Sequence, residues 1–198
     1  MSAMTDIARL RSYVQAMTRL ADRTPDEATW LREGGALLRD LIAHDNWLPP
    51  ELAEPGPTYR QYLLHCDPLE RFSVVSFVWG VGQRTPVHNH KVWGLVGMLR
   101  GTERSVTMHP VPGGPMREGQ VDVLRPGEVV EVGSGETDAH WVENALTDAP
   151  SISIHVYGGN IGAVERHVFD PATSATRRFV SGYTNAAVPN LWDRSRAA

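Results

Sequence analysis

The chain has 198 residues, enough for one domain with a sizeable hydrophobic core. A formal net charge of -4 argues against a general nucleic-acid binder, because neutralising phosphates needs clustered basic residues. A single cysteine excludes an intrachain disulfide. Residues 1–20 lack the continuous apolar run of a signal peptide or membrane span, so we expect a cytoplasmic protein without a membrane partner.

The first part of the chain, residues 1–57, is predicted to be helical. Apolar residues recur there at helical spacing, at Ile7, Leu10, Val14 and Met17, and predict an amphipathic helix over about 5–21. Thr24-Pro25 has the form of an N-cap followed by a first helical residue, and predicts a second helix that runs to about His44. Gly34-Gly35 weakens that helix in its middle, and a proline-rich stretch ends it.

From Tyr59 onward the sequence changes to short apolar segments separated by glycine and proline. Strands are predicted at about 59–65, 71–79, 92–100, 103–109, 120–124, 128–132, 140–143, 151–157, 165–169 and 177–181. Many short strands between turn signals indicate an all-β sandwich or barrel. We expect one domain over 1–198 with a mainly β fold, in which helical residues 1–57 pack outside a β-barrel formed by 58–185, followed by a tail, 186–198.

Three histidines form the most informative pattern. His88 and His90 are one residue apart beside a strongly apolar segment, and His140 follows in a second β-rich region. Residues i and i+2 of a strand point to the same face, so both side chains project into one space that a distant strand can reach. Three neutral imidazoles, with no thiolate or carboxylate in the motif, indicate a divalent transition metal. The alternative is that they are ordinary polar strand residues.

A second pattern is Ser153-x-His155-x-Tyr157, in which period-two spacing places the three polar side chains on one face of a strand. The apolar residues between them face the other way. A Ser–His–Tyr relay would position the tyrosine hydroxyl and set the tautomer of His155. The alternative is a strand whose polar face meets solvent.

The histidines and the surrounding glycines resemble the two motifs of the cupin double-stranded β-helix, a jelly-roll barrel, over about 80–157. The usual first motif carries a metal-binding glutamate three or four residues after its second histidine, where this chain has Gly94 and Leu95. The implied site therefore has three histidines and no carboxylate. Such a site leaves a bound divalent ion strongly electrophilic and favours an anionic ligand such as a thiolate.

A wider stretch, from about Tyr59 to Phe169, resembles the thiol dioxygenases, the cysteine dioxygenase family of cupins, and most closely the bacterial 3-mercaptopropionate dioxygenase branch. The matching segments are Pro86–His90, Val92–Gly97, Leu99–Gly101 and Ser151–Gly158. The resemblance implies one Fe(II) per chain, held by His88, His90 and His140. It also implies an oxidoreductase that adds both atoms of O2 to a small carboxylated thiol and gives a sulfinic acid.

The resemblance also implies roles outside the metal ligands. Ser153, His155 and Tyr157 match the family's catalytic row. Animal cysteine dioxygenases bind the substrate carboxylate with an arginine at the position of Gln61, whereas the 3-mercaptopropionate branch has glutamine there and uses an arginine that Arg166 matches. A planar guanidinium suits a carboxylate. The alternatives are a surface ion pair for Arg166 and an ordinary edge-strand residue for Gln61.

Animal cysteine dioxygenases also cross-link a cysteine after the metal motif to the active-site tyrosine. The corresponding stretch here, residues 92–96, has no cysteine, so we expect an unmodified Tyr157.

Other functions compatible with the sequence come from different classes. The substrate could be cysteine or another thiol such as mercaptosuccinate. A three-histidine cupin could instead hold Zn²⁺ and act as a hydrolase, or bind a small molecule without catalysis. Nothing in the sequence indicates a particular oligomeric state.

Overall fold

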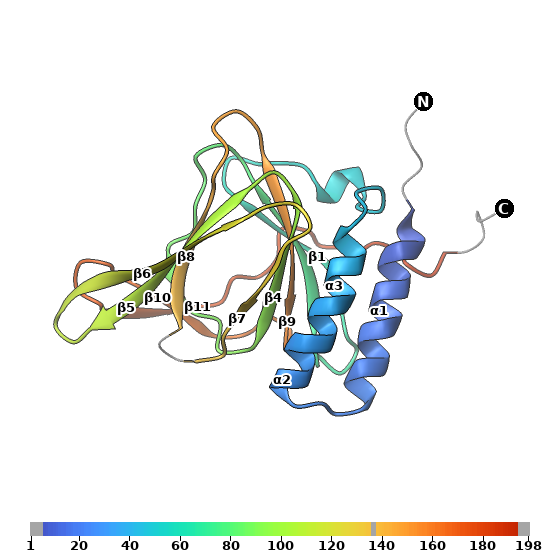
Figure 1. Ribbon diagram of the computed structural model, residues 1–198, viewed down its shortest axis with the longest axis horizontal. Coiled ribbons are helices and arrows are strands. Elements are labelled where there is room, and N and C mark those ends of the chain that lie inside the picture. The colour runs from blue at the N-terminus through green and yellow to red at the C-terminus, as the bar shows by residue number, and fades with distance from the viewer. Residues whose placement is uncertain (1–5, 136–137, 194–198) are drawn as a thin grey trace.

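A computed structural model describes residues 6–135 and 138–193. Two antiparallel sheets curve round to form a barrel, with the N-terminal helices on one side of it (Figure 1). The expected fold class, a mainly β double-stranded β-helix with a small helical segment outside, is confirmed.

The five-stranded sheet carries the side of the barrel next to the helices. Its strands, in spatial order, are β1 (Arg60–Cys66), β2 (Ser73–Trp79), β9 (Ser151–Tyr157), β4 (Gly94–Arg100) and β7 (Val129–Val132). Every residue of β2 and β9 is buried. These two strands lie in the interior of the sheet with a covered surface on both sides.

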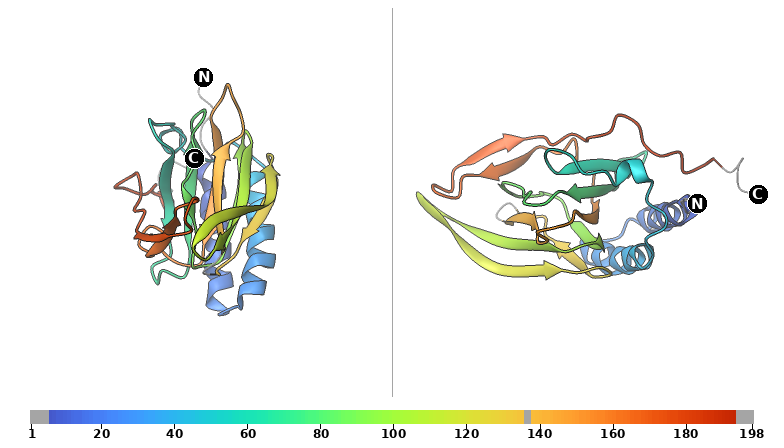
Figure 2. Two further views of the ribbon diagram at one scale, coloured as in Figure 1. Left: turned by 90° about the vertical axis from the view of Figure 1, so that its left-hand side faces the viewer. Right: turned by 90° about the horizontal axis from the view of Figure 1, so that it is seen from above.

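The six-stranded sheet forms the opposite side and extends away from the helices (Figure 2). Its strands, in spatial order, are β11 (Thr176–Phe179), β10 (Arg166–Phe169), β3 (Val87–His88), β8 (Ala139–Asn144), β5 (Glu103–Val111) and β6 (Gly114–Leu124). Two elements differ from the sequence prediction. The two-residue β3 is too short to give a periodic signal, and β6 begins six residues earlier than the predicted 120, because exposed polar residues continue its pairing with β5.

The helical part begins with α1 (Ile7–Asp22), as predicted from about residue 5, which lies outside the described residues. The second helix has three pieces: α2 (Glu27–Thr29), the π-helical η1 (Trp30–Gly34) and α3 (Gly35–Ile42). The irregular middle coincides with the predicted weakness at the paired glycines. A 3-10 turn, η2 (Pro50–Leu52), follows.

The predicted N-cap at Thr24 is wrong. The cap is Asp26, whose Oδ1 accepts a hydrogen bond from the Thr29 amide at 2.8 Å. Thr24 instead has a φ of 47°, a left-handed conformation that lets the chain turn sharply between the two helices. A residue before proline is disfavoured in the helical region, which is consistent with a helix that starts only after Pro25.

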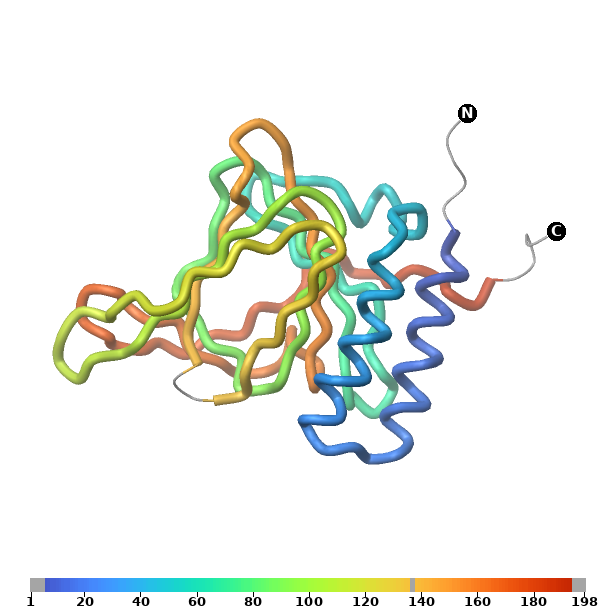
Figure 3. Tube along the Cα trace, viewed as in Figure 1, coloured from blue at the N-terminus to red at the C-terminus, as the bar shows by residue number. Residues whose placement is uncertain are grey.

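The apolar faces of α1 and α3 pack on the outer face of the five-stranded sheet, and the tube in Figure 3 shows the two helices lying side by side next to it. The approach is close at Gly97 in β4, where a Cβ atom would lie 3.0 Å from the Leu38 side chain of α3. Leu191 of the C-terminal tail docks into the same core, whereas Trp192 is 54% exposed. The rest of the tail, 194–198, lies outside the described residues.

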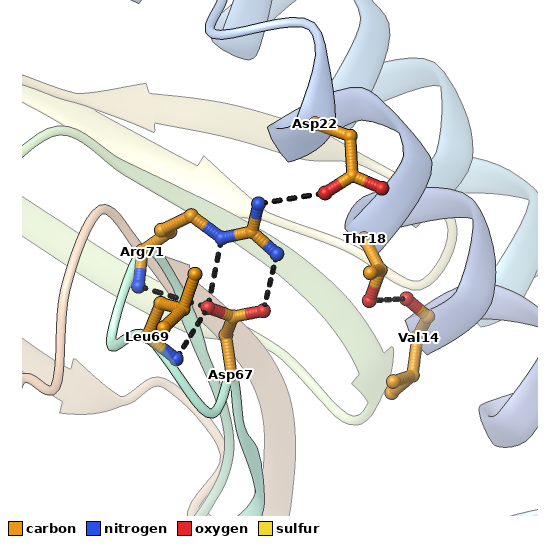
Figure 4. Close-up of polar contacts among 6 residues, drawn as sticks. All are labelled: Val14, Thr18, Asp22, Asp67, Leu69 and Arg71. Atoms are coloured by element: carbon orange, nitrogen blue, oxygen red, sulfur yellow. Dashed lines mark hydrogen bonds and ion pairs between the residues drawn. The ribbon is translucent and has the colours of Figure 1, made fainter.

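An ion-pair cluster ties α1 to the turn between β1 and β2 (Figure 4). The Arg71 guanidinium donates to Asp67 from Nε at 2.9 Å and from Nη2 at 2.8 Å, and its Nη1 donates to Asp22 at 2.8 Å. These hydrogen bonds from Arg71 lower the pKa of the Asp67 carboxyl. Ion pairs as well as apolar packing therefore hold α1 against the sheet.

In the part of the chain that the structure describes, no helix is both long and apolar enough to span a bilayer.

Candidate metal centre and adjacent pocket

The three predicted metal ligands meet in space. His88 ends β3 and lies opposite His140 of β8 in the strand register, while His90 follows in the next loop. One ligand nitrogen from each residue lies within 4.8 Å of the others, and the ring centroids are 4.9–5.0 Å apart. The group comes from segments about fifty residues apart, which the antiparallel pairing of β3 with β8 brings together.

The three histidines have the neutral protonation state that metal ligands need. Burial lowers the pKa of His88 to about 3 and that of His140 to about 4, and it lowers the pKa of His90 well below its usual value, so all three rings are neutral near pH 7. His88 Nδ1 lies 3.0 Å from the Pro86 carbonyl oxygen. Because only a protonated nitrogen can bond a carbonyl, the Nε2 of His88 keeps its lone pair.

The other two rings point to the same conclusion. His140 Nδ1 lies 3.0 Å from the Ser105 hydroxyl, which orients the ring and leaves Nε2 for a ligand. Nδ1 of the buried His90 has no hydrogen-bond partner among the described residues. A buried imidazole with an unpaired nitrogen, in a group where His88 and His140 each keep a free nitrogen, fits a metal ion, because buried polar atoms rarely go unpaired. The group could therefore bind a metal ion.

The row on β9 also forms as expected. His155 Nε2 lies 2.8 Å from Ser153 Oγ, and His155 Nδ1 lies 2.8 Å from Tyr157 Oη. The Tyr157 ring stacks on His90 at a centroid distance of 5.5 Å, so the hydroxyl end of the row lies beside the histidine group. Burial lowers the pKa of His155 to about 3 and raises that of Tyr157 above its usual value, so both are neutral near pH 7. The solvent-facing alternative for this strand is excluded.

Tyr157 lies next to Gly94, its register partner on β4. A Cβ atom at Gly94 would be 2.9 Å from Tyr157 Cδ1. The position nearest to the ring on this strand thus carries no side chain, which supports the expectation of an unmodified tyrosine.

A small pocket adjoins the histidine group, and both predicted substrate residues line it. Its lining consists of Tyr59, Gln61, Phe77, Thr85, Pro86, His88, Tyr157, Arg166, Phe179 and Ser181. Gln61 donates to Ser181 Oγ at 3.2 Å and to the Gly182 carbonyl at 3.0 Å. Arg166 donates to the same Ser181 Oγ at 2.7 Å. Ser181 therefore joins the two residues, and nothing in the local sequence singled it out.

Arg166 is 4% exposed, yet none of the ion pairs among the described residues includes it, and its buried Nε has no hydrogen-bond partner there. Its guanidinium carbon lies 4.7 Å from the centre of the Phe179 ring. Burial lowers the pKa of this guanidinium, which nevertheless stays charged because its usual pKa is so high. The surface ion pair considered for Arg166 is excluded, since Glu165 pairs with Arg178 instead.

Besides Ser181, sequence reasoning missed Glu103 of β5. It is 2% exposed, and its carboxyl lies beside the Ser153 hydroxyl and the Trp79 indole. Burial raises its pKa to about 8. The signal was present, since Glu103, Ser105 and Thr107 alternate on one face of a predicted strand, but alternation alone does not say which face is inside.

No family model matches the chain. Similar solved structures include a double-stranded β-helix protein from Klebsiella pneumoniae subsp. pneumoniae MGH 78578, with 15% identity and a TM-score of 0.45 over 70% of this chain and 94% of that one. A cupin 2 conserved barrel domain protein from Salinispora arenicola CNS-205 has 18% identity and a TM-score of 0.43 over 59% of this chain and 89% of that one. A cupin domain from Bordetella pertussis Tohama I has 18% identity and a TM-score of 0.40 over 51% and 93%. Identities and scores this low say nothing about activity.

Proposed function

We propose that the protein is a thiol dioxygenase that converts a small carboxylated thiol, with 3-mercaptopropionate as the best candidate, and O2 into the corresponding sulfinic acid. The observation that carries the proposal is the buried Arg166, which has no acidic partner among the described residues and lines the pocket that also contains His88 and Tyr157. A buried cation without an acid is costly unless a ligand supplies the anion. A carboxylate is such an anion, and a guanidinium binds it bidentately.

The three histidines are proposed to hold one Fe(II) per chain. When bound, the iron would supply a site for the substrate thiolate and the electron transfer that activates O2. Both oxygen atoms end on the sulfur, so the four electrons that reduce O2 come from the thiol and no further reductant is needed. The protein contributes the neutral ligands, which leave the charge of the ion uncompensated and so favour a thiolate.

The pocket residues orient the substrate. Arg166 holds the carboxylate at one end, and this second attachment fixes the sulfur at the metal end of a short molecule. Gln61 holds the shared Ser181 hydroxyl and thereby keeps the guanidinium in place. The Tyr157 hydroxyl, held by His155, lies beside His90 and can donate a hydrogen bond to the reacting atoms.

The deciding experiment is anaerobic reconstitution with Fe(II), followed by oxygen uptake with 3-mercaptopropionate, L-cysteine, mercaptosuccinate and cysteamine, compared by kcat/KM. Sulfinate formation coupled to oxygen uptake, with 3-mercaptopropionate preferred, would support the proposal. If cysteine or mercaptosuccinate is preferred, the reaction stands and the substrate assignment fails. Absence of turnover with all four thiols, despite bound iron, would contradict the reaction and favour a Zn²⁺ hydrolase or a binding protein.

The role of Arg166 is tested by Arg166→Ala. We expect KM for carboxylated thiols to rise by about 100-fold, since a charged hydrogen-bonded contact is lost, while cysteamine, which has no carboxylate, shows no such rise. Arg178→Ala is the matched control, because Arg178 is an exposed arginine on the neighbouring strand. An unchanged KM in Arg166→Ala would remove the residue from the substrate site.

A further inference from the structure

Glu103 occupies a position that the proposed reaction does not use. Its side chain is buried inside the barrel, at the far end of the Ser153–His155–Tyr157 row from the metal centre. Its carboxyl lies beside the Ser153 hydroxyl and the Trp79 indole, neither of which carries charge. Its second oxygen, Oε1, is buried and has no partner among the described residues.

Among the described residues, the groups that share the cavity beside Glu103 bring no positive charge. The titratable ones are Asp122 of β6, Glu131 of β7, Asp138, His140 of β8 and His155 of β9. The two histidines are neutral near pH 7, and the other three are acids. A carboxylate at Glu103 would be desolvated, would lack a cation and would face other acids, so the protonated form is favoured.

Protonation of Glu103 matters because Ser153 Oγ has one proton and two lone pairs. The Trp79 indole can only donate, and its Nε1 lies 3.3 Å from Ser153 Oγ. If Glu103 also donates to this oxygen, both lone pairs are occupied. The single Ser153 proton then has one remaining acceptor within reach, His155 Nε2 at 2.8 Å.

The remaining bonds of the row follow from this count. If His155 Nε2 accepts, the neutral ring carries its proton on Nδ1, which donates to the Tyr157 oxygen 2.8 Å away. The Tyr157 hydroxyl proton is then free to point into the pocket. If Glu103 were a carboxylate, Ser153 would donate its hydroxyl proton to it. His155 Nε2 would then donate to Ser153 Oγ, and the Tyr157 hydroxyl would donate to His155 Nδ1 instead of pointing into the pocket.

We propose that Glu103 is a positioning residue that, as a carboxylic acid, sets the direction of the whole hydrogen-bond row and turns the Tyr157 hydroxyl proton toward the metal centre. The direction of the row is a property of the folded chain alone. Only its consequence for turnover rests on the proposed function.

The test is the tautomer of His155, read from ¹⁵N chemical shifts in protein labelled at histidine and loaded with diamagnetic Zn²⁺ or left metal-free. His155→Gln assigns the signal. We expect the proton on Nδ1 at neutral pH and a shift to Nε2 well above the pKa of Glu103. Glu103→Gln should keep the Nδ1 tautomer at both pH values, because the amide donates without titrating.

Glu143→Gln is the matched control. Glu143 is a half-buried glutamate on β8 that pairs with Arg104 at 3.0 Å, and its loss should leave the pH dependence of the His155 tautomer unchanged. A proton on Nε2 at neutral pH in the wild type, or the same pH dependence in Glu103→Gln, would overturn the proposal. If Glu103→Gln does not fold, infrared titration of the wild type replaces it: the band of a protonated buried carboxyl must disappear together with the Nδ1 tautomer, and independent changes would contradict the proposal.

Kinetics separate this inference from the proposed function. In an active dioxygenase, Glu103→Leu should lower kcat by about tenfold with little change in KM, because one hydrogen bond to the reacting atoms is misdirected. In the wild type, kcat should fall at high pH, where Glu103 loses its proton. Glu103→Gln should keep the wild-type kcat at neutral pH and should not show this fall. If the tautomer behaves as expected but no thiol is oxidised, the proposed function fails and the role of Glu103 in directing the row stands.

Discussion

The two faces of β9 are equally buried but differ in what they do. One face carries Ser153, His155 and Tyr157, which hydrogen-bond one another inside the barrel. The other carries Ile152, Ile154 and Val156, which pack in the core beneath the helices. Buried polar groups that satisfy each other hold a geometry, whereas buried apolar groups supply stability. Along β9, residues that hold the geometry of the site thus alternate with residues that stabilise the fold.

The comparison of the two faces predicts the largest change, a loss of metal binding, for His140→Ala. Removing one of three ligands should abolish stable metal binding, while the free energy of unfolding of the metal-free protein changes little. Metal content after gel filtration and urea unfolding measure the two effects. His44→Ala, at an exposed histidine, should retain metal as the wild type does. Full metal occupancy in His140→Ala would disprove the ligand assignment.

Ile154→Ala should instead lower the unfolding free energy and leave metal binding nearly unchanged. The side chain is fully buried, so its truncation should cost about 2–5 kcal/mol of unfolding free energy, whereas Ile154→Val should cost about 1 kcal/mol. Metal affinity should change little in both variants. A large loss of metal affinity in the folded Ile154→Ala protein would show that the two faces of β9 are coupled.

On the helical side, Asp67→Asn should lower the unfolding free energy by about 2 kcal/mol near neutral pH, since it breaks hydrogen bonds from a charged arginine. The pKa of Asp67 is lowered in the folded state, so its contribution is present above the ordinary aspartate pKa and is lost as pH falls through the folded value. Urea unfolding at a series of pH values should therefore bring wild type and variant together in acid. A constant difference would contradict this assignment.

The smallest effect is expected for Ser105→Ala, which removes the hydroxyl beside His140 Nδ1 and should weaken metal affinity by about tenfold. Thr107→Val serves as the control, because Thr107 lines the same cavity and lies opposite His140 in the strand register, but among the described residues no hydrogen bond joins it to that ring. Competition with a metal chelator measures both variants. Equal affinities in the two would mean that Ser105 does not orient the ring.

Much of this arrangement could be predicted from the sequence. Period-two spacing aligned the β9 row, because strand geometry is local. The same spacing correctly grouped His88 with His90, although β3 ends at His88 and a loop, rather than a shared strand face, carries His90. Glu103 and Ser181 could not be found in this way, since their roles depend on which strands become neighbours. The cap at Asp26 was missed because Thr24-Pro25 offers the same local signal two residues earlier, and only the packed structure decides between them.

The position of β9 has a consequence for how the pocket opens. Its amides are bonded between β2 and β4 and every side chain is buried, so their hydrogen exchange should require nearly global unfolding. Arg166 and Phe179 instead pair across β10 and β11 at the edge of the other sheet, where β11 is mostly exposed. Amides there should exchange through local opening. The β9 side of the pocket should thus open only when the protein unfolds, whereas the β10–β11 side can move when a ligand enters.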